Sequence, residues 1–171
     1  MFSASEITPS VGKYQEAGVS EKVTITEVVL IENNGVTSLQ LKTSNEHGQT
    51  SQSKRLSLKT EVTPGKSVAA WTISAKYLQN VIMSATGCSV VESQVVLKAG
   101  SVAELKQNLE RSLVGKSVRG LFSSREYQEG KFAVELYVTE AVGGKRLVWD
   151  PSNKYYNIKL APSTPSDGLP F

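Results

Sequence analysis

Hydrophobic and polar residues alternate along the first third of the chain, in whole or in part, with the period of two that is typical of β-strands. Three segments show this alternation: residues 21–31, 36–43 and 50–60. Asn33-Asn34-Gly35 separates the first two, and an Asn-Gly pair tolerates the positive φ angles of a tight hairpin turn. A polar turn at residues 45–48 leads into the third segment. The pattern therefore predicts a meander of three antiparallel strands.

The apolar spacing changes to three and four in the middle of the chain, which predicts amphipathic helices. Residues 67–84 carry a stripe of this kind, formed by Trp71, Ala75, Leu78 and Ile82, and Gly87 ends the pattern. Residues 101–114 carry a second stripe, formed by Leu105, Leu109 and Leu113. Ser101 and Glu104 have the spacing of a capping box at the start of this helix. Residues 89–97 are ambiguous, and a short extended segment is one interpretation.

Two further alternating segments, residues 116–127 and 131–142, flank a turn at 128–130 and are predicted to form a hairpin. In the second segment one face carries an apolar set, formed by Phe132, Val134, Leu136 and Val138. The opposite face carries Ala133, Glu135, Tyr137 and Thr139.

The complete order is three strands, a helical insert at 67–114 and two strands. Five strands with helices between the third and fourth is the order of an OB-fold, a small barrel that binds oligonucleotides or oligosaccharides. We therefore predict a mainly β, OB-fold-like five-stranded barrel with a helical insert, over residues 1–160. A generic α+β domain has the same string of elements, so the fold alone does not give the function. Residues 161–171 are rich in Pro, Ser and Thr and are predicted to form a flexible tail.

The composition fits a single intracellular domain. Cys88 is the only cysteine among 171 residues, which excludes an internal disulfide and fits a reducing compartment. No run approaches the roughly 20 apolar residues of a membrane helix, and the first residues lack the pattern of a signal peptide. We therefore expect a cytoplasmic protein with no membrane partner. The net charge of +3 is a mild bias that points weakly to nucleic acid.

Cations and aromatic rings gather on the last three predicted strands and in the segment after them. A protein that binds single strands needs cations for phosphates and flat rings on which bases stack, at about 1–3 kcal/mol per base. Phe122, Phe132 and Trp71 are interpreted as core residues. For the remaining rings, binding to bases and burial in the core are equally favoured interpretations: Tyr137, Trp149, Tyr155 and Tyr156. The predicted DNA-binding residues are Lys54, Arg55, Arg119, Arg125, Tyr137, Trp149 and Tyr155.

The sequence SDGLPF at residues 166–171 resembles the C-terminal tip of bacterial and phage single-stranded-DNA-binding proteins. In that family an OB-fold is joined to a flexible tail that ends in acidic residues, an apolar residue, Pro and Phe. The resemblance implies that this tip recruits replication and recombination proteins, through the matching residues Asp167, Leu169, Pro170 and Phe171. The chain departs from the family pattern because Asp167 stands alone and Gly168 is inserted before Leu169. The alternatives are an accidental apolar end and an end that packs on its own domain.

Residues for catalysis are sparse. His47 is the only histidine and falls in a predicted turn, and Cys88 has no CxxC partner for zinc. No acidic pair with a shared cleft and no phosphate-binding loop is visible in the sequence. We therefore predict a protein that is not an enzyme and has no catalytic residues, metal site or cofactor.

These features predict a protein that binds and protects single-stranded DNA with little sequence preference, during DNA replication or recombination. The divergent core and the compact single domain with a tail resemble the phage members of the family. The alternative is a non-enzymatic structural or interaction protein, such as a virion component, that assembles in solution and ignores oligonucleotides. The oligomeric state is left open by the sequence.

Overall fold

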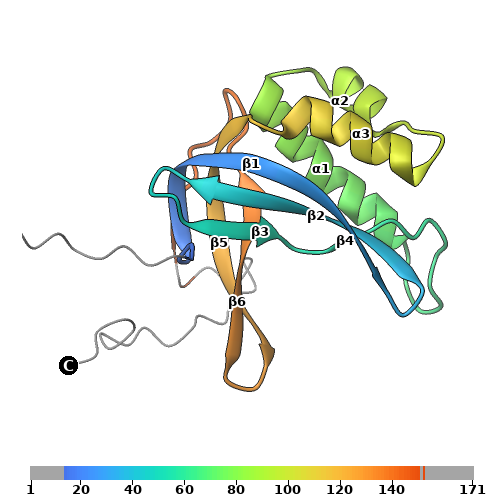
Figure 1. Cartoon of the computed structure of the whole chain (residues 1–171), viewed down its shortest axis with the longest axis horizontal. Helices are drawn as coiled ribbons and strands as arrows, with labels where there is room; N and C mark the ends of the chain where they lie inside the picture. Colours follow the sequence, from blue (N-terminus) through green and yellow to red (C-terminus); the bar gives the residue numbers. More distant parts are fainter. Residues whose placement is uncertain (1–13, 151, 153–171) are drawn as a thin grey trace, which may run out of the picture.

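The computed structural model describes residues 14–150 and residue 152. It shows a β-barrel with three helices packed together along one side (Figure 1). The strands are β1 (Gly18–Asn33), β2 (Val36–Asn45), β3 (Thr50–Ser53), β4 (Leu56–Ser57), β5 (Ser117–Gln128) and β6 (Lys131–Thr139). The helices are α1 (Ala70–Thr86), α2 (Val90–Leu97) and α3 (Val102–Leu113).

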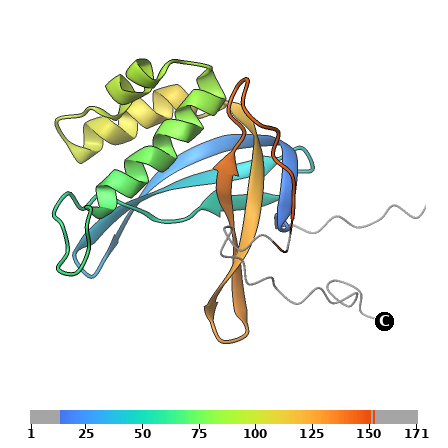
Figure 2. The ribbon, with the colours of Figure 1, turned by 180° about the vertical axis from the view of Figure 1, so that it is seen from behind.

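The strands close into a mixed five-stranded barrel. β1 pairs with both β2 and β5, β2 pairs with β3, and β5 pairs with β6, all antiparallel. The parallel pairing of β3 with β6 completes the circle, and β4 adds a short pairing with β2. The predicted fold class, a mainly β, OB-fold-like barrel with helices inserted before the last two strands, is confirmed. The β5–β6 hairpin extends past the barrel on the side away from the helices (Figure 2).

A β-bulge lets β1 pair with two neighbouring strands. Its register against β2 shifts between Ile25 and Glu27, so that the buried residues Ile25 and Val28 are three positions apart in place of two. A bulge bends its strand and increases the local twist. The 16-residue strand can therefore curve from β5 at its start to β2 at its end.

The predicted third strand is interrupted. β3 ends at Ser53 and β4 begins at Leu56, so Lys54 and Arg55 lie in the break. The hydroxyl of Ser53 accepts a hydrogen bond from the Leu41 N–H at 2.9 Å and donates one to the Lys54 carbonyl at 2.8 Å. Because a side chain takes over one backbone hydrogen bond of β2, the strand bends there and both cationic side chains are exposed.

The segment at 89–97 forms helix α2, so its interpretation as an extended segment was wrong. Ser89 accepts a hydrogen bond from the Glu92 N–H, and the Glu92 carboxylate accepts from the Ser89 N–H, which is a complete capping box. In α3 the predicted cap Ser101 accepts from the Glu104 N–H, but the Glu104 carboxylate accepts from the N–H of Gly100 in place of Ser101.

The helices cover the barrel through the predicted stripes. Leu78 and Ile82 of α1, together with the three leucines of α3, are buried against Ile25, Val28 and the inner residues of β2. Trp71 is half-buried at the edge of this cluster. A second cluster fills the rest of the barrel and is formed by Val23, Val118, Phe122 and Leu136, which confirms Phe122 as a core residue.

At the end of β6, another β-bulge changes which residues point toward the interior of the protein. Leu121 lies opposite Val138 and Phe122 lies opposite Leu136, so Tyr137 is the extra residue of the bulge. The predicted face for Thr139 was therefore wrong. Its side chain is buried against α1, where its hydroxyl lies 2.8 Å from that of Ser84.

Candidate functional site

A polar hollow of about 600 Å³ lies between the outer surface of the barrel and the β5–β6 hairpin. We call it the hairpin hollow. Its lining residues come from β2, from β3 and the break after it, and from the hairpin: Gln40, Gln52, Lys54, Arg55, Arg125, Tyr127, Ala133 and Glu135. The hollow therefore gathers three of the seven predicted DNA-binding residues, namely Lys54, Arg55 and Arg125.

The strand register explains why these side chains share one surface. Gln52 lies opposite Glu135 of β6, and Arg125 of β5 lies opposite Ala133. Residues directly opposite each other point to the same face of a sheet. Leu136, next to Glu135 on β6, and Phe122, three positions before Arg125 on β5, are buried in the core instead. The polar lining therefore lies on the outer face of these two strands.

Arg125 and Glu135 form an ion pair inside the hollow. The Arg125 Nε lies 2.9 Å from one carboxylate oxygen of Glu135, and an outer guanidinium nitrogen lies 3.4 Å from the other. The side chain of Arg125 is 52% exposed, whereas that of Glu135 is only 12% exposed. The hydrogen bond to Glu135 raises the pKa of Arg125, so the guanidinium keeps its charge across the accessible pH range.

Lys54 joins the hollow to helix α1. Its Nζ lies 5.6 Å from the centre of the Tyr77 ring, within the range of a cation–π contact. The Tyr77 hydroxyl donates a hydrogen bond to the Leu136 carbonyl, and burial, together with the nearby charge of Glu135, raises the pKa of Tyr77. The ring is therefore a fixed, neutral platform that positions the Lys54 ammonium at the edge of the hollow.

Neutral polar groups and one ring complete the lining. Gln40 is buried, and its amide nitrogen donates to the Ser53 carbonyl at 2.9 Å, which fixes the direction of its side chain. Tyr127 is 53% exposed on the hairpin. The hollow can therefore offer phosphates cations, and offer bases a flat ring and side-chain amides.

Arg119 lies outside the hollow, where two carboxylates and a backbone carbonyl surround its guanidinium. Its Nε lies 2.9 Å from Glu21, and one terminal nitrogen lies 2.8 Å from Glu140 and 2.7 Å from the Leu147 carbonyl. The hydrogen bond to Glu21 is the main cause that raises the pKa of Arg119. With its side chain only 14% exposed and two carboxylates beside it, Arg119 ties the segment after β6 to the barrel.

The remaining predicted residues are not part of the hollow. Tyr137 is 39% exposed at the bulge of β6, and Trp149 is half-buried in the segment after that strand. Tyr155 and the four predicted tip residues, Asp167, Leu169, Pro170 and Phe171, lie outside the described residues.

Five lining residues were not among the predicted binding residues: Gln40, Gln52, Tyr127, Ala133 and Glu135. Tyr127 and Glu135 had a detectable signal, because alternation along their strands separates them from the buried positions. Gln40 had none, since it follows Leu39 in a run of four buried residues and only the cross-strand register shows which way it points.

The described part of the chain shows two further features that bear on function. No three His, Cys, Asp or Glu side chains in it lie close enough to hold a metal ion. None of its helices has the length and apolar character required to span a membrane.

Comparison with known proteins adds no family assignment. No protein-family model matches the chain, and no curated protein matches it.

Proposed function

We propose that the protein binds single-stranded DNA in the hairpin hollow, with little sequence preference. The observation that carries the proposal is the convergence of Lys54, Arg55 and Arg125 with the Tyr127 ring on the outer face of an OB-fold-like barrel. Cations along a groove and a ring for base stacking are the two components of sequence-tolerant single-strand binding. Neither Lys54 nor Arg55 forms an ion pair with any residue that the structure describes, so both charges face the hollow uncompensated.

The test is fluorescence-anisotropy binding of labelled oligo-dT across a salt series. The double variant Lys54→Ala/Arg55→Ala should weaken binding at least tenfold at low salt and reduce the slope of log K against log salt by about 1.4, or about 0.7 for each phosphate that is no longer neutralised. The matched control is Lys98→Ala/Lys116→Ala, which removes the same charge from exposed positions outside the hollow. Equal effects of the two double variants, or a flat salt titration of the wild type, would contradict the proposal.

The role in replication or recombination, and the cytoplasmic location, belong to the same proposal. The Leu169-Pro170-Phe171 segment would then bind partner proteins, with Asp167 beside it. Deletion of residues 166–171 should leave oligo-dT affinity unchanged or raise it, while abolishing the binding of replication proteins.

A second candidate function, assembly as a structural or interaction protein, is favoured by helix α2. Val90, Val91 and Val95 are 47%, 68% and 65% exposed. Short helices with apolar residues on every side are usually covered. Assembly into a large ring or tube in sedimentation experiments, without oligonucleotide binding, would select this function.

A further inference from the structure

One acidic side chain lies among the cations of the hairpin hollow. Glu135 is the only acid among the described residues that line it, and it sits behind Arg125 with 12% of its side chain exposed. An acid in this position reduces the positive potential that a phosphate would meet. Its place in a nucleic-acid-binding hollow therefore needs an explanation.

The geometry of the pair shows which group Arg125 is arranged to accept. Two nitrogens of its guanidinium face the two carboxylate oxygens of Glu135, at 2.9 Å and 3.4 Å. The same fork matches the two non-bridging oxygens of a phosphodiester group. Because Arg125 is 52% exposed, an incoming phosphate can reach the guanidinium from the solvent side.

The exchange has a cost that falls on Glu135. When a phosphate pairs with the Arg125 guanidinium, the Glu135 carboxylate loses its ion-pair partner. The carboxylate nevertheless remains largely shielded from water. A part-buried charge without a partner is unfavourable, and it also repels the phosphate. Lys54 and Arg55 line the same hollow and limit this cost, since their charges are not used by another carboxylate of the described residues.

We propose that Glu135 holds the place of a nucleic-acid phosphate on Arg125, and that strand binding exchanges this carboxylate for a phosphodiester group. The inference rests on the proposed function and goes further, because it assigns Arg125 to the backbone of the strand and Glu135 to the control of affinity. Ligands without a charged backbone gain nothing from the exchange.

The first experiment compares Glu135→Gln with the wild type in oligo-dT binding. Gln keeps the shape of the side chain but removes the charge that competes for Arg125. We expect affinity to rise about threefold to tenfold, and the salt slope to steepen by up to about 0.7, because Arg125 then forms a full phosphate contact. The matched control is Glu129→Gln, which makes the same charge change at an exposed turn position outside the hollow.

Two further measurements separate exchange on Arg125 from a general effect of charge. In the Arg125→Ala background, Glu135→Gln should leave the salt slope unchanged, because no guanidinium is left to neutralise a phosphate. With a methylphosphonate oligo-dT, whose backbone is neutral, Glu135→Gln should give no gain over the wild type. A steeper salt slope in the Arg125→Ala background, or a gain in affinity for the neutral strand, would overturn the inference.

The outcomes also distinguish this inference from the proposed function. Absence of salt-dependent oligo-dT binding by the wild type overturns both. Binding that is lost in Lys54→Ala/Arg55→Ala, but is equal in Glu135→Gln and Glu129→Gln, keeps the proposed function and overturns the exchange. Thermal unfolding of each variant shows that the compared proteins are folded.

Discussion

At the scale of single residues, Gly120 marks a place where the barrel interior leaves no room for a side chain. A Cβ atom at this position would lie 2.7 Å from a methyl carbon of Leu136 and 3.4 Å from one of Val23. Leu136 is fully buried, so its side chain has no free space into which to turn. Overpacking of this kind costs about 1–3 kcal/mol. Gly120→Ala should therefore lower the free energy of unfolding by that amount, as measured by urea denaturation.

The contact with Leu136 can be tested by a double-mutant cycle. Leu136→Val removes one methylene group from the site and should itself cost about 1 kcal/mol. Combined with Gly120→Ala, the two losses should sum to more than the loss measured for the double variant, since each change compensates the other. Strict additivity would show that the crowding at Gly120 comes from another neighbour.

At the scale of elements, the segment after β6 is held by a charge cluster whose strength depends on pH. The Leu147 N–H donates to Glu140 at 2.8 Å, and Arg119 lies 2.8 Å from the same oxygen. The hydrogen bond from Leu147 and the charge of Arg119 lower the pKa of Glu140, against an opposing effect of burial. A carboxyl group with a lowered pKa stabilises the fold above its ordinary value of 4.5, and this stabilisation is lost as the pH falls through the lowered value.

Glu140→Gln should therefore unfold at a lower urea concentration than the wild type near neutral pH. The difference between the two midpoints should shrink at a pH below the lowered pKa of Glu140, where the wild-type carboxyl is protonated as well. Other groups with a lowered pKa, such as Glu46, are present in both proteins and cancel in this comparison. Glu129→Gln serves as the control and should match the wild type at both pH values. A difference between Glu140→Gln and wild type that does not change with pH would contradict the ionic role of Glu140.

The order of elements was predictable because the apolar period switches from two to three and four at α1 and back again at β5. The interruption at Lys54 and Arg55 was not, since residues 50–55 are all polar and have no apolar period that could reveal a break. The Ser53 side chain replaces one hydrogen bond of the ladder there. In α2, the valines favour a strand by propensity, but the capping box at Ser89 outweighs them. The bulge at Tyr137 depends on the partner strand, so no period within β6 reveals it.

For the candidate site, the sequence identified cations but not their partners. Arg119 and Arg125 both stand on β5 and looked alike, yet Arg119 is paired with Glu21, 98 positions away in the sequence. Arg125 is paired across one hairpin with Glu135, and the two residues lie in the two segments that were predicted to form that hairpin. Nearby pairs along a hairpin are therefore within reach of sequence reasoning, whereas pairs that depend on barrel closure are not.

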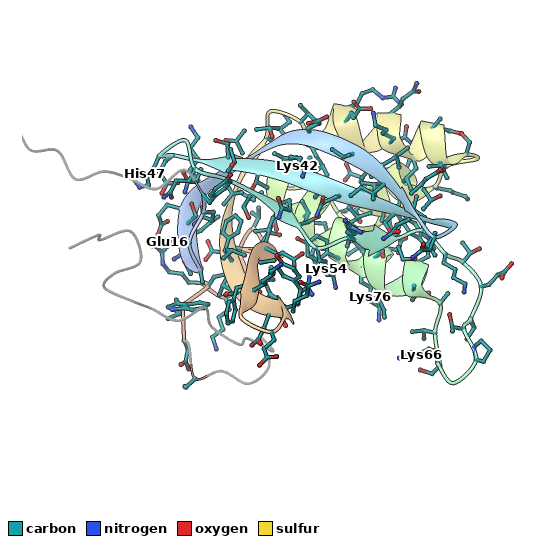
Figure 3. All side chains as sticks on the ribbon, turned by 60° about the horizontal axis from the view of Figure 1, so that its bottom comes forward. Glu16, Lys42, His47, Lys54, Lys66 and Lys76 are labelled. Carbon is teal, nitrogen blue, oxygen red and sulfur yellow. The ribbon has the colours of Figure 1, made fainter. Side chains whose placement is uncertain are left out.

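At the scale of the whole molecule, lysine side chains extend from the hairpin hollow toward one end of the structure (Figure 3). Glu16 lies toward one end of the molecule, whereas Lys54, Lys76 and Lys66 follow one another toward the other end (Figure 3). Lys54 contacts the ring of Tyr77, and Lys76 is the exposed residue next to that ring on α1. Lys76 therefore extends the basic surface of the hollow onto helix α1, and under the proposed function a bound strand would leave the hollow in that direction.

The charge-reversing substitution Lys76→Glu tests this path, because its effect on affinity should depend on the length of the bound strand. An oligo-dT of about 4 nucleotides is near the lower limit of the site sizes of OB-folds, whereas one of about 15 is near the upper limit. Lys76→Glu should weaken the longer strand several-fold and flatten its salt slope by about 0.7, with little effect on the shorter strand, because only the longer one reaches α1. Lys98→Glu makes the same change on the far helical layer and should affect neither length. An equal loss for both lengths would mean that Lys76 acts through the general field of the protein, and no loss would place the exit of the strand elsewhere.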